Sequence, residues 1–404
     1  MSKKAVIFLA DGMADENLPE LGGKTPLEYA HTPGMDEIAK RGASGTFLTL
    51  PEGLPTSSDV ANMSVLGFDP ESNYPGRGPI EATAQNITLG KDDIAWRCNL
   101  VYVSSDGVLR DYSAGHISPE TAAVLMADLQ KEFGSDEVTF HTGVSYRNLL
   151  VLHGEKFSSL IDYFKPDSSQ DIPVADLPLT PKADLPQVHC TIKFLNDLCA
   201  RCAAFLSAHP LNQGKESPAN AIWPWSPGKR PSLPPFETLY DGRKGAVISA
   251  VDVIKGIGRC GGMQVIDVPG ATGFLDTNYA GKVDAALKAL EHNDLVYIHV
   301  EAIDECSHLG NLQYKLQAIE DFDAKIVVPV LQALKGKDVN FAVLPDHPVP
   351  IKLRCHTTTP VPLAVCGTCC QCDDITAFSE NLAPRGALGH IGGTALVRML
   401  LELD

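Results

Sequence analysis

AVIFLADG, residues 5–12, is an apolar run that stops at a carboxylate, and it is the clearest sign of how the chain folds. LVYIHVEAID (residues 295–304) and NFAVLPDH (residues 340–347) repeat this pattern far along the chain. Short continuous apolar runs rich in β-branched residues are typical of strands buried on both faces of a parallel sheet. Residues 282–290 and 313–334 lie between or beside these runs and have the apolar spacing of helices. The alternation predicts a layered α/β fold with a mostly parallel sheet.

Acidic and imidazole side chains gather where these runs end. The carboxyl ends of parallel strands meet at one edge of an open α/β sheet, and ligands bind there. A helix cap or a turn is the simpler role for a single aspartate at such a place. Asp and His ligands without cysteine suit zinc or manganese better than magnesium. We therefore expect a divalent-metal site among the following residues: Asp11, Asp304, His308, Asp346, His347 and His356.

Residues 55–67, PTSSDVANMSVLG, predict a helix that starts after proline and hydroxyl residues and ends at Gly67. A serine at a helix N-terminus near metal ions is well placed to be a nucleophile, because free N–H groups and the ions stabilise negative charge. Ser58 is the residue that this argument favours. A plain N-cap serine would give the same local pattern.

The composition excludes several function classes. The chain has 404 residues and a formal net charge of −17, which argues against general affinity for nucleic acid or anionic membranes. No apolar run approaches the roughly 18 residues of a membrane span, and the N-terminus does not read as a signal peptide. We therefore expect a cytoplasmic globular protein of two or three domains.

The cysteines point away from a disulfide framework, because their number is odd, at 11, in a large chain without a secretion signal. Cys199-x2-Cys202 and the run from Cys366 to Cys372 have spacings that a structural zinc site could use. The alternative is that these are reduced thiols, with Cys199 and Cys202 packed as small buried side chains of a helix.

The chain resembles a known family, the archaeal-type cofactor-independent phosphoglycerate mutases of the alkaline phosphatase superfamily. The resemblance rests on ordered motifs along nearly the whole sequence: LADGMAD (9–15), LGGKTPLEYA (21–30), SDVAN (58–62), GRGPIEA (76–82), RCNL (97–100), DYSAGHI (111–117), GVSYR (143–147), GATG (270–273), DE with HLG (304–310), PDHP (345–348) and HT (356–357). One departure is Ser57, where relatives often have glycine before the nucleophile.

The resemblance implies an alkaline-phosphatase-like three-layer αβα core with a mostly parallel sheet, formed by residues 1–85 and 240–404. It also implies that an inserted α+β domain, residues 86–239, interrupts this core and binds the substrate. Within the insertion, the proline-rich segments 166–186 and 218–235 are expected to be loops.

The resemblance also implies the chemistry. One metal ion would be held by Asp304, His308 and His356, and a second by the remaining set: Asp11, Ser58, Asp346 and His347. Ser58 would take the phosphoryl group from 3-phosphoglycerate and return it to the 2-hydroxyl, without bisphosphoglycerate. Manganese is the expected metal, with magnesium, zinc and cobalt as alternatives.

Basic residues are expected to bind the anionic substrate. Arg77, Arg97, Arg147 and Lys282 are the substrate-binding residues we predict, since arginine binds carboxylate and phosphate in bidentate fashion. Arg97, Arg147 and His116 are also expected to take part in catalysis, His116 by moving the hydroxyl proton. Ordinary surface ion pairs are the competing interpretation of these residues.

Other functions stay open at this point. A homoserine kinase-like phosphotransferase on the same fold is one alternative, although the sequence contains no Gly-x4-Gly-Lys-Ser/Thr phosphate loop. A metal-dependent phosphatase or phosphodiesterase is another, because the same metal core serves hydrolysis. The expected partner is a small phosphorylated substrate, and the sequence leaves monomer and homo-oligomer undecided.

Overall fold

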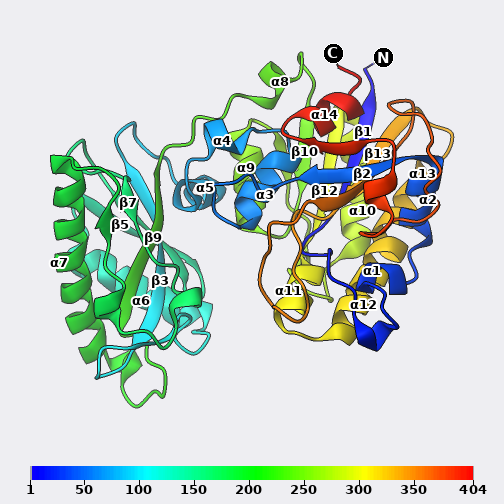
Figure 1. The fold of residues 1–404 in the computed structure, drawn as a ribbon. Coiled ribbons are helices and arrows are strands. Elements are labelled where there is room, and N and C mark those ends of the chain that lie inside the picture. The colour runs from blue at the N-terminus through cyan, green and yellow to red at the C-terminus, as the bar shows by residue number, and fades with distance from the viewer. Residues whose placement is uncertain (1, 404) are drawn as a thin grey trace. The chain divides into compact units, whose positions relative to one another are not determined.

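The computed structural model describes residues 2–403. The chain divides into two compact units (Figure 1). Residues 1–74 and 233–404 form the core unit, and residues 75–232 form the inserted unit. The inserted unit begins before the expected boundary at residue 86, because helix α5 (Arg77–Ala84) packs against strands β3 and β9 of this unit. None of the helices found in residues 2–403 is long and apolar enough to cross a membrane.

The core unit is built on an eight-stranded sheet in the order β11-β10-β12-β1-β13-β14-β2-β15. All strands run in the same direction except β14, which is antiparallel to both of its neighbours. The bounds are β1 (Lys4–Ala10), β2 (Gly42–Leu48), β10 (Gly245–Ile248), β11 (Gln264–Ile266), β12 (Leu295–Val300), β13 (Val339–Leu344), β14 (Val361–Cys366) and β15 (Gly389–Gly392). The predicted α/β class is confirmed, and the three apolar runs that predicted it are the adjacent strands β12, β1 and β13.

Helices cover both faces of this sheet, which gives the expected three layers (Figure 1). One face carries α2 (Pro33–Arg41), α10 (Tyr279–His292), α12 (Leu312–Phe322) and α13 (Val328–Ala333). The other carries α3 (Ser58–Val65), α9 (Asp252–Cys260) and α14 (Ala395–Leu400). The remaining helices are α1 (Pro26–Tyr29), α4 (Pro70–Asn73), α8 (Phe236–Leu239) and α11 (Ala302–His308).

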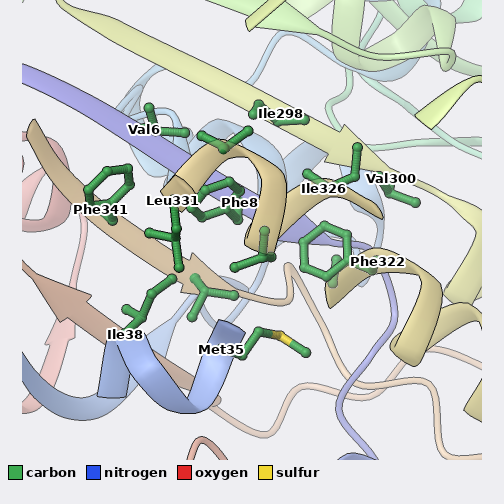
Figure 2. Packing of buried hydrophobic residues seen from close by; sticks show 14 of the residues in the cluster. Val6, Phe8, Met35, Ile38, Ile298, Val300, Phe322, Ile326, Leu331 and Phe341 are labelled. Carbon is green, nitrogen blue, oxygen red and sulfur yellow. The ribbon is translucent and has the colours of Figure 1, made fainter. Parts of the chain in front are cut away.

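The core on the α2 and α10 side follows the alternation of the strands. Val6 and Phe8 of β1 point to this face together with Ile298 of β12, and all three are buried (Figure 2). Met35 and Ile38 of α2 pack against them because they lie three residues apart on one side of that helix. Burial of this apolar surface is the main favourable term that stabilises the unit.

The helix expected over residues 313–334 is interrupted. A π-helical turn, η5 (Asp323–Val327), separates α12 from α13. The Asp323 carboxylate accepts hydrogen bonds from the backbone N–H groups of Gly34, at 2.9 Å, and Met35, at 2.7 Å. These N–H groups lie in the first turn of α2 and have no partner within that helix, so Asp323 caps it from a distant part of the chain.

The inserted unit has a five-stranded antiparallel sheet in which β3 pairs with β4, β6 and β9, and β6 pairs also with β5. The strands are β3 (Ile94–Val103), β4 (Leu109–Asp111), β5 (Val138–Val144), β6 (Arg147–Leu152) and β9 (Ala221–Lys229). A separate two-stranded ladder joins β7 (Ile161–Asp162) to β8 (Thr180–Pro181). Helices α6 (Pro119–Phe133) and α7 (Pro186–Ala208) cover one face and α5 covers the other.

One expectation for this unit is wrong. The proline-rich segment 218–235 contains strand β9, which pairs with β3 over most of its length. Pro224 and Pro227 are tolerated there because β9 pairs with β3 on one side only, so the ladder does not need their missing N–H groups. The strand contributes Trp225 to the unit's arginine cluster described below.

Candidate active site

The residues predicted to bind metal come together at one edge of the core unit's sheet. Asp11 directly follows β1, and Asp346 and His347 follow β13. Asp304 and His308 lie on α11, the helix that follows β12. Because β12, β1 and β13 are parallel neighbours, these side chains lie close together, as the strand-end argument predicts.

The first ligand group is Asp304, His308 and His356, whose ligating atoms lie within 4.8 Å of one another. The two histidine Nε2 atoms are 3.1 Å apart, and His308 Nε2 lies 3.3 Å from Asp304 Oδ2. His308 Nδ1 is 2.8 Å from the carbonyl oxygen of Arg354, so Nδ1–H donates there and Nε2 is the ring nitrogen that faces the group. This arrangement is what a metal ligand requires.

The second group is Asp11, Asp346 and His347, all fully buried. His347 Nε2 lies 3.5 Å from Asp11 Oδ1 and 3.3 Å from Asp346 Oδ2. The same nitrogen is 3.1 Å from the Oγ of Ser58. Ser58 is the first residue of α3, so its hydroxyl lies at the helix end where N–H groups lack partners within the helix. The predicted nucleophile therefore faces the second ligand group.

Gly12 is required between the two groups. Its φ is +64°, and a Cβ at this position would lie 2.7 Å from Asp304 Oδ1. Its backbone N–H donates to Asp346 Oδ1 at 3.1 Å. Any side chain would push Asp304 out of place, so the turn after β1 needs glycine on grounds of both conformation and space.

Burial and mutual repulsion raise the pKa values of three of the four carboxyl groups of the site. Burial raises the pKa of Asp11 well above its ordinary value, and the charge of Asp346 adds to this. Burial likewise raises the pKa of Asp346 to about 6 and that of Glu301 to about 8, with Asp304 contributing to both. Burial would also raise the pKa of Asp304, but the hydrogen bond and charge of His308 lower it to about 2. Such crowding of acids needs a compensating positive charge.

Burial favours the neutral form of histidine and therefore acts to lower the pKa values of the site's imidazoles. Burial lowers the pKa of His347 to about 4 and that of His356 to about 3, so both imidazoles are neutral near pH 7. Burial would also lower the pKa of His308, but the hydrogen bond and charge of Asp304 raise it to about 9, so a cation bound there would have to displace its proton. Neutral imidazole is the form that binds a metal ion.

The donor set fits divalent cations by a further test. Buried oxygens of Asp11 (Oδ1), Asp304 (Oδ1) and Glu301 (Oε2) have no hydrogen-bond partner. Buried polar atoms are normally paired, so unpartnered carboxylate oxygens beside neutral imidazoles indicate a place for cations. The mixture of carboxylate and imidazole, without thiolate, agrees with manganese, magnesium, zinc or cobalt chemistry.

Residues that sequence reasoning did not assign to the site support its ligands. His299 on β12 is 3.0 Å from Asp11 Oδ2 through Nε2 and 3.1 Å from Ser249 Oγ through Nδ1. Asn62 of α3 donates through Nδ2 to Asp346 Oδ2 at 2.8 Å, and the Tyr297 hydroxyl donates to Asn62 Oδ1. Such bonds fix the orientation of ligating side chains.

The predicted basic residues other than Lys282 lie in the inserted unit, where Glu81 of α5 organises them. Arg97 is two residues from Ala95 on β3 and shares its face, so it meets α5. Its Nε donates to Glu81 Oε2 at 3.0 Å, while Arg77 Nε donates to Glu81 Oε1 at 2.9 Å. The Arg97 guanidinium also stacks 4.2 Å from the centre of the Trp225 ring.

The charges of three arginines act on one buried carboxylate in this cluster. Burial would raise the pKa of the Glu81 carboxyl, but the charges of Arg97, Arg77 and Arg147 lower it. Burial lowers the pKa of Arg97 to about 10; Glu81 opposes this, and the charges of Arg77 and Arg147 add to it. One buried carboxylate therefore faces more than one arginine, which suits the binding of an anion.

Aromatic side chains adjoin the cluster. Arg147 lies over the Tyr146 ring at 5.1 Å and donates through Nε to its hydroxyl at 3.1 Å. Tyr146 packs edge-on against Tyr112 at 5.4 Å and near His116 at 6.4 Å. His116 has a φ of +50°, so the backbone that carries this ring is in the left-handed conformation.

Lys282 is placed differently from the prediction. It belongs to α10 of the core unit, is fully buried, and donates through Nζ to the backbone carbonyl oxygen of His299 at 2.7 Å. Burial lowers its pKa to about 8, with Glu301 opposing the shift. This position beneath β12 supports the strand that carries His299 and does not offer the ammonium group to a substrate.

Known proteins resemble this chain over nearly its whole length. Residues 39–212 match the family described as 2,3-bisphosphoglycerate-independent phosphoglycerate mutase. A protein of that name from Methanothrix thermoacetophila is 46% identical over 98% of this chain and 99% of its own length. A probable enzyme of the same name from Geobacter sulfurreducens is 43% identical over 99% of this chain and all of its own length.

Solved structures show the same fold over the full chain. A protein from Pyrococcus horikoshii is 26% identical, with a TM-score of 0.83 over 100% of this chain and 97% of its own. A cofactor-independent phosphoglycerate mutase from Thermoplasma acidophilum is 27% identical, with a TM-score of 0.66 over 99% of each chain. The resemblance drawn from the sequence motifs is confirmed: the chain belongs to the family of 2,3-bisphosphoglycerate-independent phosphoglycerate mutases.

Proposed function

We propose that this protein interconverts 3-phosphoglycerate and 2-phosphoglycerate by way of a phosphoserine at Ser58. The observation that carries the proposal is the position of Ser58 Oγ, 3.1 Å from His347 Nε2 at the N-terminus of α3 and beside the second ligand group. Family membership supplies the substrate, because the full-length relatives are named as phosphoglycerate mutases.

In the first half-reaction, Ser58 Oγ attacks the phosphorus of 3-phosphoglycerate, and the bond between phosphorus and the C3 oxygen breaks. In the second, the 2-hydroxyl oxygen of the glycerate attacks the phosphoserine, and the phosphorus–Oγ bond breaks. The first-turn N–H groups of α3 lower the energy of negative charge on the transferring group. His116 is proposed to move the hydroxyl proton of the glycerate. No bisphosphoglycerate is consumed, because Ser58 holds the phosphoryl group between the two steps.

Two divalent cations would complete the site. Asp304, His308 and His356 would hold one, and a second set would hold the other: Asp11, Ser58, Asp346 and His347. When bound, they would supply positive charge that activates the serine and stabilises the transferring phosphoryl group. Manganese is our proposal, because the donor set combines carboxylate and hydroxyl oxygens with imidazole nitrogens.

We assign substrate binding to the inserted unit and metal binding to the core unit. Arg77, Arg97 and Arg147 would bind the carboxylate or phosphate of the glycerate, with Glu81 and Trp225 holding Arg97 in place. The enzyme is proposed to work in the cytoplasm, where phosphoglycerates are made and consumed.

A coupled enolase assay on metal-depleted protein tests the proposal. We expect 2-phosphoglycerate to form without added bisphosphoglycerate once manganese, magnesium, zinc or cobalt is restored. Ser58→Ala should abolish it, whereas Ser57→Ala is the matched control, since Ser57 Oγ bonds only weakly to Pro55 O at 3.4 Å. Mass spectrometry of quenched reactions should find phosphate on Ser58. Release of inorganic phosphate without 2-phosphoglycerate would show a phosphatase instead.

A further inference from the structure

The cysteines do not provide a further metal site. Within residues 2–403, the groups of three close ligand atoms include no cysteine sulfur, so the spacings of Cys199 with Cys202 and of the run from Cys366 to Cys372 do not produce a zinc site. Cys199 and Cys202 instead pack with the apolar core of the inserted unit. A different cluster of polar side chains in that unit has the geometry of a reactive site.

This cluster lies on one face of the inserted unit's sheet, at its edge strand β5. Thr139 and His141 alternate on β5 with Phe140, which is buried in the core formed with α6 and α7, so they point to the opposite face. His153 directly follows the neighbouring strand β6, and Asp93 directly precedes β3. The four polar residues are partly exposed, so a small molecule can reach them from solvent.

Hydrogen bonds join the four side chains in one line. Thr139 Oγ1 lies 2.9 Å from His153 Nε2, and His153 Nδ1 lies 3.1 Å from Asp93 Oδ1. The other carboxylate oxygen of Asp93 accepts the backbone N–H of Gly90 at 2.8 Å, which fixes the orientation of the carboxylate. On the other side of the hydroxyl, His141 Nε2 lies 3.0 Å from Thr139 Oγ1.

The carboxylate decides which atoms donate along this line. A carboxylate only accepts hydrogen bonds, so His153 donates to Asp93 through Nδ1–H and its Nε2 is left to accept. The Thr139 hydroxyl has a single hydrogen, which it donates to that nitrogen. His141 therefore donates to Thr139 Oγ1 through Nε2–H. The imidazole of His153 is thus placed to take the proton of the threonine.

We propose that Thr139 is a nucleophile that takes the acyl group of a small activated ester, with His153 as its general base and Asp93 as the positioning residue. A hydroxyl beside an imidazole that a third group orients is the arrangement that makes serine or threonine nucleophilic. The hydroxyl–imidazole and imidazole–carboxylate distances, 2.9 and 3.1 Å, lie within the range that proton transfer requires.

In the reaction, Thr139 Oγ1 attacks the carbonyl carbon of the ester, and its proton passes to His153 Nε2. The bond between that carbon and the alcohol oxygen then breaks, His153 gives the proton to the departing alcohol, and the acyl group stays on Thr139. His141 Nε2–H, beside Oγ1, is available to donate to the carbonyl oxygen as this gains negative charge.

This reaction is independent of phosphoryl transfer. The four side chains belong to the inserted unit, whereas Ser58 and the metal-ligand groups belong to the core unit. Acylation uses no cation, so it should proceed unchanged in EDTA, where Ser58 has no metal ion to activate it. Failure of the mutase proposal would therefore leave this one standing, and the reverse also holds.

Treatment of the full-length protein with 4-nitrophenyl acetate in EDTA, followed by peptide mapping, tests the proposal. Thr142, an exposed threonine of the same strand, is the internal control. Thr139 should gain an acetyl group at least about 100-fold faster than Thr142, because general-base catalysis contributes on the order of 10²–10⁴ to a rate. Thr139→Ser should keep the rapid acetylation at residue 139, since it keeps the hydroxyl.

Two positions separate the base from the residue that orients it. His153→Gln should lower the acetylation rate of Thr139 to that of Thr142. Asp93→Asn should slow it at least about tenfold, although the amide oxygen still accepts from Gly90, and Asp93→Glu should recover part of the rate. Thr142→Val is the matched control and should leave the rate at Thr139 unchanged.

Three results would overturn the proposal. The first is a lack of acetyl group on Thr139 in the unaltered protein, and the second is acetylation of Thr139 and Thr142 at equal rates. The third is a rate at Thr139 that His153→Gln leaves unchanged.

Discussion

Replacing Asp11 with asparagine should stabilise the metal-free protein. Asp11 and Asp346 belong to one group of ligand atoms within 4.8 Å, and both are fully buried. Two unit charges at that distance repel by about 3.5 kcal/mol at an effective dielectric constant of about 20. The neutral amide would remove this repulsion, and its oxygen would keep the bond that His299 now makes to Asp11 Oδ2. In a domain the size of the core unit, 1 kcal/mol shifts Tm by about 2–4 °C, so the metal-free variant should melt roughly 7–14 °C higher.

Manganese should cancel this difference. A cation that binds only the folded state stabilises it by about 4 kcal/mol per site when its concentration is 1,000 times Kd. The unaltered protein should therefore gain about 8–16 °C per occupied site. Asp11→Asn loses a carboxylate ligand of the second group and should keep only the gain from the first, provided by Asp304, His308 and His356.

Calorimetry at pH 8, with EDTA or with manganese, measures both effects, and elemental analysis gives the metal content. Asp374→Asn, at an exposed aspartate of the same unit, is the control and should shift Tm by less than about 2 °C in either condition. A variant Asp11→Asn that melts below the unaltered protein in EDTA would refute the electrostatic reasoning. If manganese does not change the Tm of the unaltered protein, the metal site itself is refuted.

Three further outcomes are expected. Lys315→Met should lower the free energy of unfolding, measured in urea, by about 3–5 kcal/mol. The change leaves the buried carboxylate of Asp15 without its ion-pair partner at 2.7 Å. A loss below about 1 kcal/mol would contradict this. Burial raises the pKa of Glu380 to about 7, so its contribution to stability is full below about pH 4.5 and is lost as the pH rises through 7. Glu380→Gln should make the free energy of unfolding depend less on pH and should raise it at pH 8 by about 1–2 kcal/mol. The partial exposure of Glu380 keeps this effect small. Identical plots of unfolding free energy against pH for the two proteins, from pH 5 to 8, would count against the prediction. Glu81→Gln should raise the KM for phosphoglycerate about tenfold or more, with a smaller change in kcat, because Arg97 loses its buried partner; an unchanged KM would remove the arginine cluster from substrate binding.

The parts of the fold that the sequence predicted are those in which a single local pattern decides the structure. Continuous apolar runs predicted β1, β12 and β13, and hydroxyl residues before an apolar helix predicted α3. Strand β9 was not predicted, because its prolines indicate a loop. A local pattern cannot show that a strand pairs on one side only, where proline is tolerated.

Site residues could be predicted where a charged residue ends an apolar run, as Asp11 does. They were missed where polar side chains lie within the run. Tyr297 and His299 lie two residues apart on β12, and that spacing places both on one face of the strand. Lys282 was misjudged because a cation on a helix is normally exposed, and only the packed structure shows that its ammonium group reaches the backbone of β12.

The central place of β1 has a consequence for synthesis on the ribosome. Its neighbours β12 and β13 start at Leu295 and Val339, so the first strand made is paired only after most of the chain has emerged. At translation rates of about 5–20 residues per second, β1 waits on the order of 15–60 s with its apolar side chains uncovered. The inserted unit is a continuous segment, and its full sequence is made before β12. Chaperone demand during translation should therefore fall mainly on residues 4–10, and fusion or truncation near the C-terminus should lower the soluble yield more than changes within residues 75–232.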